Sequence, residues 1–451
     1  MSATLAEPRT QDSVLTHRPL IQRPLIHRLD NGLTVVLEPV PGLPAVGVTV
    51  AYDVGYRTEA RPGFAHLFEH LMFQGSATLP KHAHAQAIQA AGGAFNAATQ
   101  RDHTAYYEVV PSEALELALF LEADRMRSPR ITRETIDNQA AVVAAEIRRN
   151  VLNRPYGGFP AFQLPEVLFT RHANSHNGYG DFEALAGVGV GECEEFFEHY
   201  YAPGNAVLAL SGGFEPAAAL DLIDRHFGRL PARAVPERPQ LDEPRPEASR
   251  VKTRLDRLAP VPAVAVGWRC PAPGTPEYLA AVVAAAVLGD AQTGRLRTAL
   301  VRERGLASQA SVLPALTGQA YQARDPEAIV ATAICAGGAP PEAVAEEIQA
   351  QLARLAGPER DGGLTAAEAG RAARCLEAAW HAETDVVAAR ARRLAVFEVL
   401  YGDAAAASGM SAALAALDPE QVRAAAAGLA ACPPAVLQVT PELDATEPGA
   451  A

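Results

Sequence analysis

The chain has 451 residues, of which 49% are hydrophobic and 20% charged, proportions typical of a globular protein with two or three domains. Its formal net charge of −13 argues against a nucleic-acid partner. Five scattered cysteines without a CxxC pair argue against a thiolate zinc site and a disulfide framework, and they favour a reducing, cytoplasmic location.

The beginning of the chain does not have the pattern of a targeting segment. Residues 1–32 are polar and interrupted by prolines, with no basic start followed by an apolar core, so we predict no secretory signal. The most apolar run, LAAVVAAAVL from Leu279, is too short to span a bilayer, so no membrane partner is expected.

The first motif with chemical content is HLFEHLMF, residues 66–73, which follows a strand predicted from alternating apolar and small residues after Pro44. On a helix, His66 and His70 share one face, and Glu69 lies on the same side. Two imidazoles one turn apart can bind one metal ion, and a neighbouring carboxylate can act on the attacking water. From these residues alone, a solvated helix face explains the pattern equally well.

A second helix is predicted from the segment TRETIDNQAAVVAAEIRRNV. Thr132 has the position of an N-cap, and Glu146 lies at the edge of an apolar stripe, with Gln139 on the same face. The stripe consists of Ala140, Val143, Ala144 and Ile147. Taken alone, Glu146 is more simply explained as a surface residue than as a metal ligand.

The chain also contains an internal repeat. The proline-rich stretch 231–249 separates two halves that both run strand, helix, strand, helix. We therefore predict an α+β fold of two homologous domains, 20–232 and 250–440, joined by a linker at 233–249. Each domain is expected to be a mainly antiparallel sheet with helices packed on one face. When Pro62 is placed over Pro276, the positions of His66, Glu69 and His70 are taken in the second half by Ala280, Val283 and Ala284.

Four segments resemble the signatures of the pitrilysin/insulinase metallopeptidases, particularly the bacterial and mitochondrial-processing type. They are HLFEHLMFQGS, AAGGAFNAATQRDHTAYYEVVP, VVAAEIRRN and FFEHYYAPGNAVLALSGGFEP. The resemblance is dense over residues 25–230 and thinner over 250–440. It implies a zinc endopeptidase in which His66, His70 and Glu146 hold Zn²⁺ and Glu69 is the general base.

The same resemblance implies a substrate strand. The segment GGAFNAAT, which begins at Gly92, matches the edge strand that pairs with an extended peptide in this family. It implies that Gly93, Phe95, Asn96 and Ala97 contact the substrate, which we expect to be a short or unfolded peptide, such as a leader segment. A turn that leads into a core strand is the alternative explanation of the segment.

Two departures from the family pattern stand out. Gln139, which we expect beside the ligands, replaces a usual glutamate seven residues before Glu146. Active members also resemble LREKxGLAY in the second half, whereas this chain reads LVRERGLAS, which places Val301 and Ser308 at the arginine and tyrosine positions. The neighbouring Arg302 and Arg304 have a different helical phase. The resemblance therefore implies a heterodimer with a homologous subunit that carries the Arg/Tyr pair.

Two alternatives complete the expectations. The chain can be a non-catalytic scaffold or peptide-holding subunit of the same fold, although relatives of that kind lose the H-x-x-E-H motif. The histidine pairs His82/His84 and His172/His176 are interpreted as surface loops without a metal.

Overall fold

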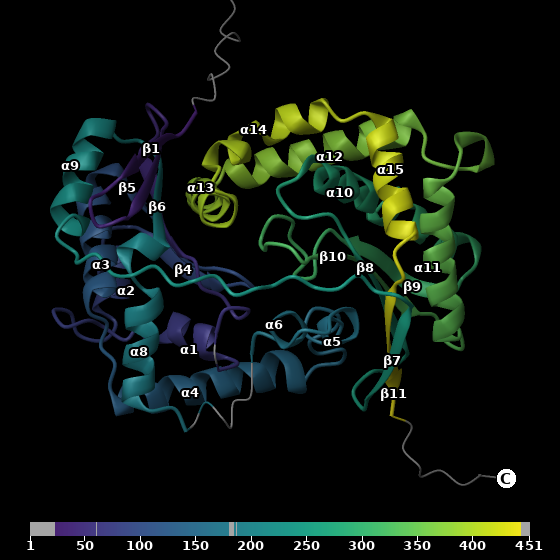
Figure 1. The fold of residues 1–451 in the computed structure, drawn as a ribbon, viewed down its shortest axis with the longest axis horizontal. Coiled ribbons are helices and arrows are strands. Elements are labelled where there is room, and N and C mark those ends of the chain that lie inside the picture. The colour runs from purple at the N-terminus through teal and green to yellow at the C-terminus, as the bar shows by residue number, and fades with distance from the viewer. Residues whose placement is uncertain (1–22, 60, 180–184, 186, 443–451) are drawn as a thin grey trace, which may run out of the picture.

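The computed structural model describes residues 23–59, 61–179, 185 and 187–442. Residues 1–22, which include the predicted start of the first domain and most of the segment 1–32 for which we predict no secretory signal, lie outside the described residues. Two sheets, one from each half of the chain, face each other across the molecule, each with its own group of helices (Figure 1). None of the described helices is both long and apolar enough to cross a membrane.

The first half forms a six-stranded sheet in the order β1-β2-β6-β3-β5-β4. Only β2 and β6 run parallel, and the other neighbours are antiparallel. The strands are β1 (Leu25–Arg28), β2 (Thr34–Pro39), β3 (Ala45–Tyr52), β4 (Ala94–Thr99), β5 (Thr104–Pro111) and β6 (Ala206–Gly212). The helices are α1 (Phe64–Leu71), α2 (Ala83–Ala90), α3 (Leu115–Arg127), α4 (Arg133–Ile147), α5 (Pro165–Leu168), α6 (His172–Ser175), α8 (Val190–Tyr200) and α9 (Pro216–Phe227).

The second half repeats this topology in the order β7-β11-β8-β10-β9, which corresponds strand by strand to β2-β6-β3-β5-β4. Its single parallel pair, β7 with β11, stands where β2 pairs with β6. The strands are β7 (Arg250–Asp256), β8 (Ala263–Arg269), β9 (Ala307–Leu313), β10 (Ala328–Cys335) and β11 (Ala435–Pro441). The helices are α10 (Pro276–Gly289), α11 (Pro341–Ala356), α12 (Ala366–Thr384), α13 (Val387–Tyr401), α14 (Ala404–Ala415) and α15 (Pro419–Ala430). The predicted α+β fold of two homologous units is therefore confirmed.

Each half also covers part of the other half. Helix α13 of the second half packs on the face of the first sheet that its own helices leave open, so closely that a Cβ at Gly47 would meet the Val387 carbonyl oxygen at 2.6 Å. In return, Leu164 and Leu168 beside α5 pack on the second sheet, where a Cβ at Gly267 would meet Leu164 at 2.9 Å. Glycine permits both close approaches because it has no side chain.

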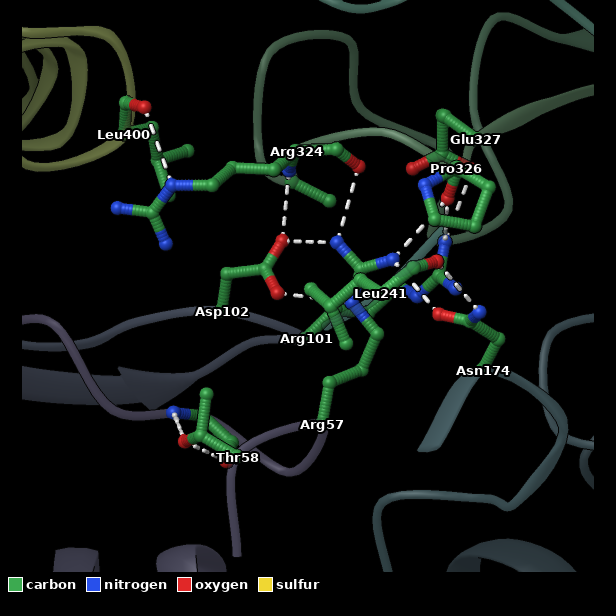
Figure 2. A network of polar contacts seen from close by, with 12 residues as sticks. Arg57, Thr58, Arg101, Asp102, Asn174, Leu241, Arg324, Pro326, Glu327 and Leu400 are labelled. Atoms are coloured by element: carbon green, nitrogen blue, oxygen red, sulfur yellow. Dashed lines mark hydrogen bonds and ion pairs between the residues drawn. The ribbon is translucent and has the colours of Figure 1, made fainter. Parts of the chain in front are cut away.

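A buried polar network also joins the two halves (Figure 2). Arg57 donates to Asp102 through Nε at 2.8 Å, and neither side chain is exposed. From the second half, the Arg324 backbone N–H donates to the same carboxylate at 2.6 Å, while its carbonyl oxygen accepts from Arg57 at 2.9 Å. The Arg324 guanidinium reaches Asp53 at 2.7 and 2.9 Å. Asp102 thus pairs with Arg57 of its own half, and Asp53 pairs with Arg324 of the other half, within one network.

Candidate metal centre

Helix α1 is oriented by its apolar face. Phe64, Leu67, Phe68 and Leu71 are buried, and the Phe68 ring lies 4.6 Å from the Phe196 ring, centroid to centroid. Because this face is fixed in the core, His66 and His70 point away from it, with side chains 12% and 20% exposed. The helical spacing predicted from the sequence is thus realised on a short helix.

Helix α4, which lies next to α1, brings the third candidate ligand (Figure 1). Thr132 caps it as predicted, since its hydroxyl accepts from the Thr135 N–H. Val143 and Ile147 are buried, so Glu146 in the last turn lies at the edge of the buried face, with a side chain 26% exposed. A π-helical turn, Arg148–Leu152, follows directly, a distortion that often occurs near functional sites.

The three side chains converge as a metal site requires. The Glu146 Oε2 atom lies 3.5 Å from His70 Nε2 and 3.9 Å from His66 Nε2, and one donor atom from each residue falls within 4.8 Å of the others. Ligand atoms about 2.0–2.2 Å from a tetrahedral zinc ion are about 3.3–3.6 Å apart. Two imidazole nitrogens and one carboxylate are also a donor set of catalytic zinc. The residues therefore fit Zn²⁺ in both chemistry and spacing.

The electrostatic environment suits the ligand form of His66. Burial, with a smaller effect from the neighbouring His70, lowers the pKa of His66 to about 4, so its imidazole is neutral at neutral pH. The other ring nitrogen, Nδ1, is buried and has no hydrogen-bond partner within the described part of the chain. His66 thus lacks the outer hydrogen bond that usually orients a ligand imidazole.

Glu69 is held by a residue that sequence analysis missed. The Thr99 hydroxyl, at the end of β4, donates to Glu69 Oε2 at 2.6 Å. Burial raises the pKa of Glu69, and the Thr99 hydrogen bond opposes that rise. Strand alternation puts Phe95, Ala97 and Thr99 on one face, so the period of the segment was the signal that could have identified Thr99.

Among the described strands, β4 lies at the edge of its sheet and pairs only with β5. Gly93, just before it, is confined, because a Cβ there would meet the Val109 carbonyl oxygen at 2.6 Å. The Phe95 ring packs against Phe73 at a centroid distance of 5.4 Å, so a peptide at this edge would meet its backbone and not its ring. Asn96 is exposed, and its Oδ1 accepts from the Ala97 N–H at 2.9 Å. An incoming strand would compete with that hydrogen bond.

Gln139 is buried on α4, but its amide donates to Asn138 Oδ1 at 2.7 Å and not to one of the candidate ligands. Its predicted role beside the ligands stays a prediction. The histidines interpreted as surface loops are a clearer case, because His84 is buried and most of the His176 side chain is covered. His84 has a side chain 8% exposed and lies 3.2 Å from Glu108, and His176 has a side chain 9% exposed. For these two residues the surface interpretation was wrong, since carboxylates distant in sequence accompany them inside.

The segment that departs from the Arg/Tyr pattern lies in the second half. Val301 packs against the hydrophobic core, and Ser308 is exposed at the start of β9, donating to the Ile334 carbonyl oxygen at 3.3 Å. Arg302 donates to the Gln292 carbonyl oxygen at 3.3 Å, and Arg304 pairs with Glu347 at 2.9 Å. Both nearby arginines are therefore engaged within their own half.

The chain is similar to a zinc protease and to subunits of mitochondrial complexes. An uncharacterized zinc protease of Mycobacterium tuberculosis is 30% identical over 377 residues, 83% of each chain. Human cytochrome b-c1 complex subunit 1 is 30% identical over 272 residues, 58% of this chain and 54% of that one. The mitochondrial-processing peptidase subunit beta of Blastocladiella emersonii is 26% identical over 270 residues, 59% of this chain and 56% of that one.

Among solved structures, a protease from Helicobacter pylori has the same fold, with a TM-score of 0.85 and 24% identity over 93% of this chain and 100% of that one. The profile of insulinase (peptidase family M16) matches residues 34–155, which contain all four candidate site residues. The profile of the peptidase M16 inactive domain matches residues 190–373. The chain therefore belongs to the insulinase family, peptidase family M16.

Proposed function

We propose that this chain is the zinc-binding subunit of an endopeptidase that cleaves short or unfolded peptides. The observation that carries the proposal is the convergence of His66, His70 and Glu146, with the Glu69 carboxylate on the same helix face. In the second half, Ala280, Val283 and Ala284 occupy the corresponding positions and are buried apolar residues. The fold thus forms without these polar groups, and their presence in the first half calls for a chemical reason.

Each residue has a defined part in the proposed reaction. His66, His70 and Glu146 would hold Zn²⁺, which polarises a carbonyl group and makes water acidic when it is bound. Glu69 would accept a proton from the attacking water and return it to the leaving amine. Thr99 holds the Glu69 carboxylate in place through its hydroxyl. The open edge of β4 would pair with the backbone of an extended peptide, with little dependence on its side chains.

The proposal includes a partner subunit. Val301 and Ser308 cannot offer a cation and a phenol to the developing oxyanion, and Arg302 and Arg304 already bind groups of their own half. We infer that a homologous subunit with the Arg/Tyr pair supplies these groups. The similarity to a processing-peptidase subunit is in keeping with a shared active site.

A non-catalytic role is the second candidate. It is favoured by the similarity to a cytochrome b-c1 complex subunit and by the match of residues 190–373 to an inactive domain. The retained site in the first half favours the enzyme, because a scaffold has no need for three converging ligands and a neighbouring carboxylate.

Metal content distinguishes the two candidates at the first step. The purified chain should bind one Zn²⁺, and His70→Ala should lose it, since two donors hold zinc poorly. His226→Ala, which removes an imidazole on α9, is the matched control and should keep the metal. Equal zinc in the wild type and His70→Ala would contradict the site.

A further inference from the structure

The helix that carries the candidate ligands begins without a cap of its own. Gly63 stands at the N-cap with a φ of 91° and has no side chain to accept from the first N–H groups. In the second half, the corresponding helix α10 has an ordinary local cap, because the Thr275 hydroxyl accepts from the Tyr278 N–H. The start of α1 is therefore stabilised differently from that of its counterpart.

A carboxylate four residues before Gly63 takes the place of that cap. Glu59 Oε1 accepts from the Gly63 N–H at 2.6 Å, and Oε2 accepts from the Ala65 N–H at 2.7 Å. The Glu59 side chain is fully buried, and its negative charge faces the positive end of the helix dipole. The preceding residue, Thr58, is fixed by the Tyr200 hydroxyl, which donates to its carbonyl oxygen at 2.9 Å. The carboxylate is thus held rigidly against the helix.

The charge of Glu59 is balanced by a histidine that lies 117 positions further along the chain. His176 Nε2 lies 3.7 Å from Glu59 Oε1 and 2.6 Å from the Tyr56 carbonyl oxygen. Its Nδ1 lies 2.8 Å from the His172 carbonyl oxygen. Carbonyl oxygens only accept hydrogen bonds, so both ring nitrogens must carry a proton, and the ring is an imidazolium.

The pKa directions agree with this geometry. Burial alone would lower the pKa of His176, but the interactions with Glu59 and with the two carbonyl oxygens outweigh it and raise the pKa above its ordinary value. Burial raises the pKa of Glu59, while the ion pair with His176 and the hydrogen bonds from the Ala65 and Gly63 N–H groups oppose that rise. Among the described residues, the groups that face this pair are the Tyr56 ring, the stacked His172 ring and the Tyr200 phenol.

We propose that Glu59 and His176 are positioning residues that clamp the N-terminus of α1 and thereby set the geometry of the metal ligands. The inference rests on the proposed function, because it takes α1 as the metal-binding helix. His66 lies one turn inside the capped end and lacks an outer hydrogen bond, so its direction depends on the helix itself. The clamp is a charged one, and it is complete only while His176 is protonated.

Zinc affinity of the full chain tests this proposal without a substrate or a partner. Competition with a chromophoric chelator at pH 6.5 should show Glu59→Gln and His176→Asn binding Zn²⁺ about 10-fold more weakly than the wild type, as for other groups that orient ligands. Thr275→Ala, which removes the cap of α10, is the matched control and should lose thermal stability without losing zinc affinity. If Glu59→Gln does not fold, His176→Asn, which keeps Glu59, tests by itself whether the pair affects zinc affinity.

Two further readouts separate positioning from general stability. The deficit of His176→Asn relative to the wild type should shrink at pH 9, because the wild-type imidazolium is lost as the pH rises through its pKa. In the metal-free protein, hydrogen exchange over residues 64–71 should be faster in Glu59→Gln. A wild type that binds no zinc would contradict the proposed function, and unchanged exchange would then also overturn the clamp. If the wild type binds zinc and both variants bind it with the same affinity, the clamp is overturned and the proposed function is not. An equal loss of zinc affinity in Thr275→Ala would also overturn the clamp alone.

Discussion

Glu69 is only partly buried, and Thr99 holds its carboxylate. Thr99 fixes one carboxylate oxygen at 2.6 Å, and the other is left for a second interaction. Such an arrangement suits a base, because the group is oriented on one side and free to accept a proton on the other. It also means that an amide of the same shape keeps the Thr99 hydrogen bond and loses only the proton acceptor.

We therefore expect Glu69→Gln to keep zinc and to lower kcat by about 10²–10⁴ in the assembly with the partner subunit. Steady-state peptide hydrolysis, together with metal analysis of the same sample, measures both quantities. Glu134→Gln, an equivalent change at an exposed position in the first turn of α4, should leave the rate unchanged. Near wild-type turnover by Glu69→Gln would remove Glu69 from the proposed role.

At the scale of single elements, caps and ion pairs hold helices in place far from the site. Glu368, the third residue of α12, accepts from Arg295 at 2.7 and 2.9 Å and completes a capping box with Thr365. Burial alone would raise the pKa of Glu368, but the hydrogen bonds from Arg295 and Thr365 outweigh it and lower the pKa to about 2. One carboxylate thus ties α12 to the segment before η4 (Arg297–Glu303).

This depressed pKa predicts an acid-sensitive contribution to stability. The ionised group stabilises the fold fully above its ordinary pKa of about 4.5, and protonation of the folded state removes that contribution as the pH falls towards about 2. Urea unfolding should show wild type more stable than Glu368→Gln at pH 7, with the difference shrinking between about pH 5 and pH 2. Glu346→Gln, an exposed change on α11, should show little difference at any pH. A constant gap for Glu368→Gln would contradict the assignment.

Local patterns in the sequence were enough to predict the helices and strands, but not the contacts between residues that are distant in the sequence. The i, i+4 spacing of His66 and His70, the Thr132 cap and the repeated order of strands are all local or periodic signals, and the structure realises them. Glu59 and His176 were not identified, because a buried ion pair between distant positions leaves no periodic signal. The burial of His84 against Glu108 was missed for the same reason.

At the scale of the whole molecule, the two halves behave as one body for physical reasons. Helix α13 and the segment around α5 are each packed on the sheet of the opposite half. Asp102 compensates Arg57, both with fully buried side chains, and it also accepts from the Arg324 backbone N–H of the second half (Figure 2). Moving the halves apart would expose apolar surface and separate buried charges. Substrate access is therefore expected from separation of the subunits and not from a hinge within this chain.

Breaking the polar network between the halves, formed by Arg57, Asp102 and Arg324, should cost much of the stability. Asp102→Asn leaves the buried Arg57 guanidinium without its counter-charge, and such losses typically cost about 3–5 kcal/mol of unfolding free energy. Urea unfolding followed by circular dichroism measures the change. Glu116→Gln breaks an ion pair with Arg225 that is exposed on both sides, and it should leave the midpoint nearly unchanged. Equal losses of unfolding free energy in the two variants would contradict this role of the network between the halves.

The last prediction comes from the proposed division of the site between two subunits. The first half of this chain holds the candidate ligands and Glu69, whereas Val301 packs against the core and Ser308 is a short hydroxyl at the start of β9. One missing oxyanion donor typically costs about 10²–10³ in rate, so the chain alone, as monomer or homodimer, should be nearly inactive on an unfolded peptide. Mixed with a homologue that carries the Arg/Tyr pair, it should form a heterodimer and cleave the peptide.

The assay compares this chain, the homologue and their mixture, with size-exclusion chromatography to establish the complex. A mixture that contains Glu69→Gln is the control, because it should form the same heterodimer without turnover if the reaction takes place at the site of this chain. Full activity of this chain alone would contradict the divided site. Arg302 or Arg304 would then have to leave the Gln292 carbonyl or the Glu347 carboxylate to reach the substrate.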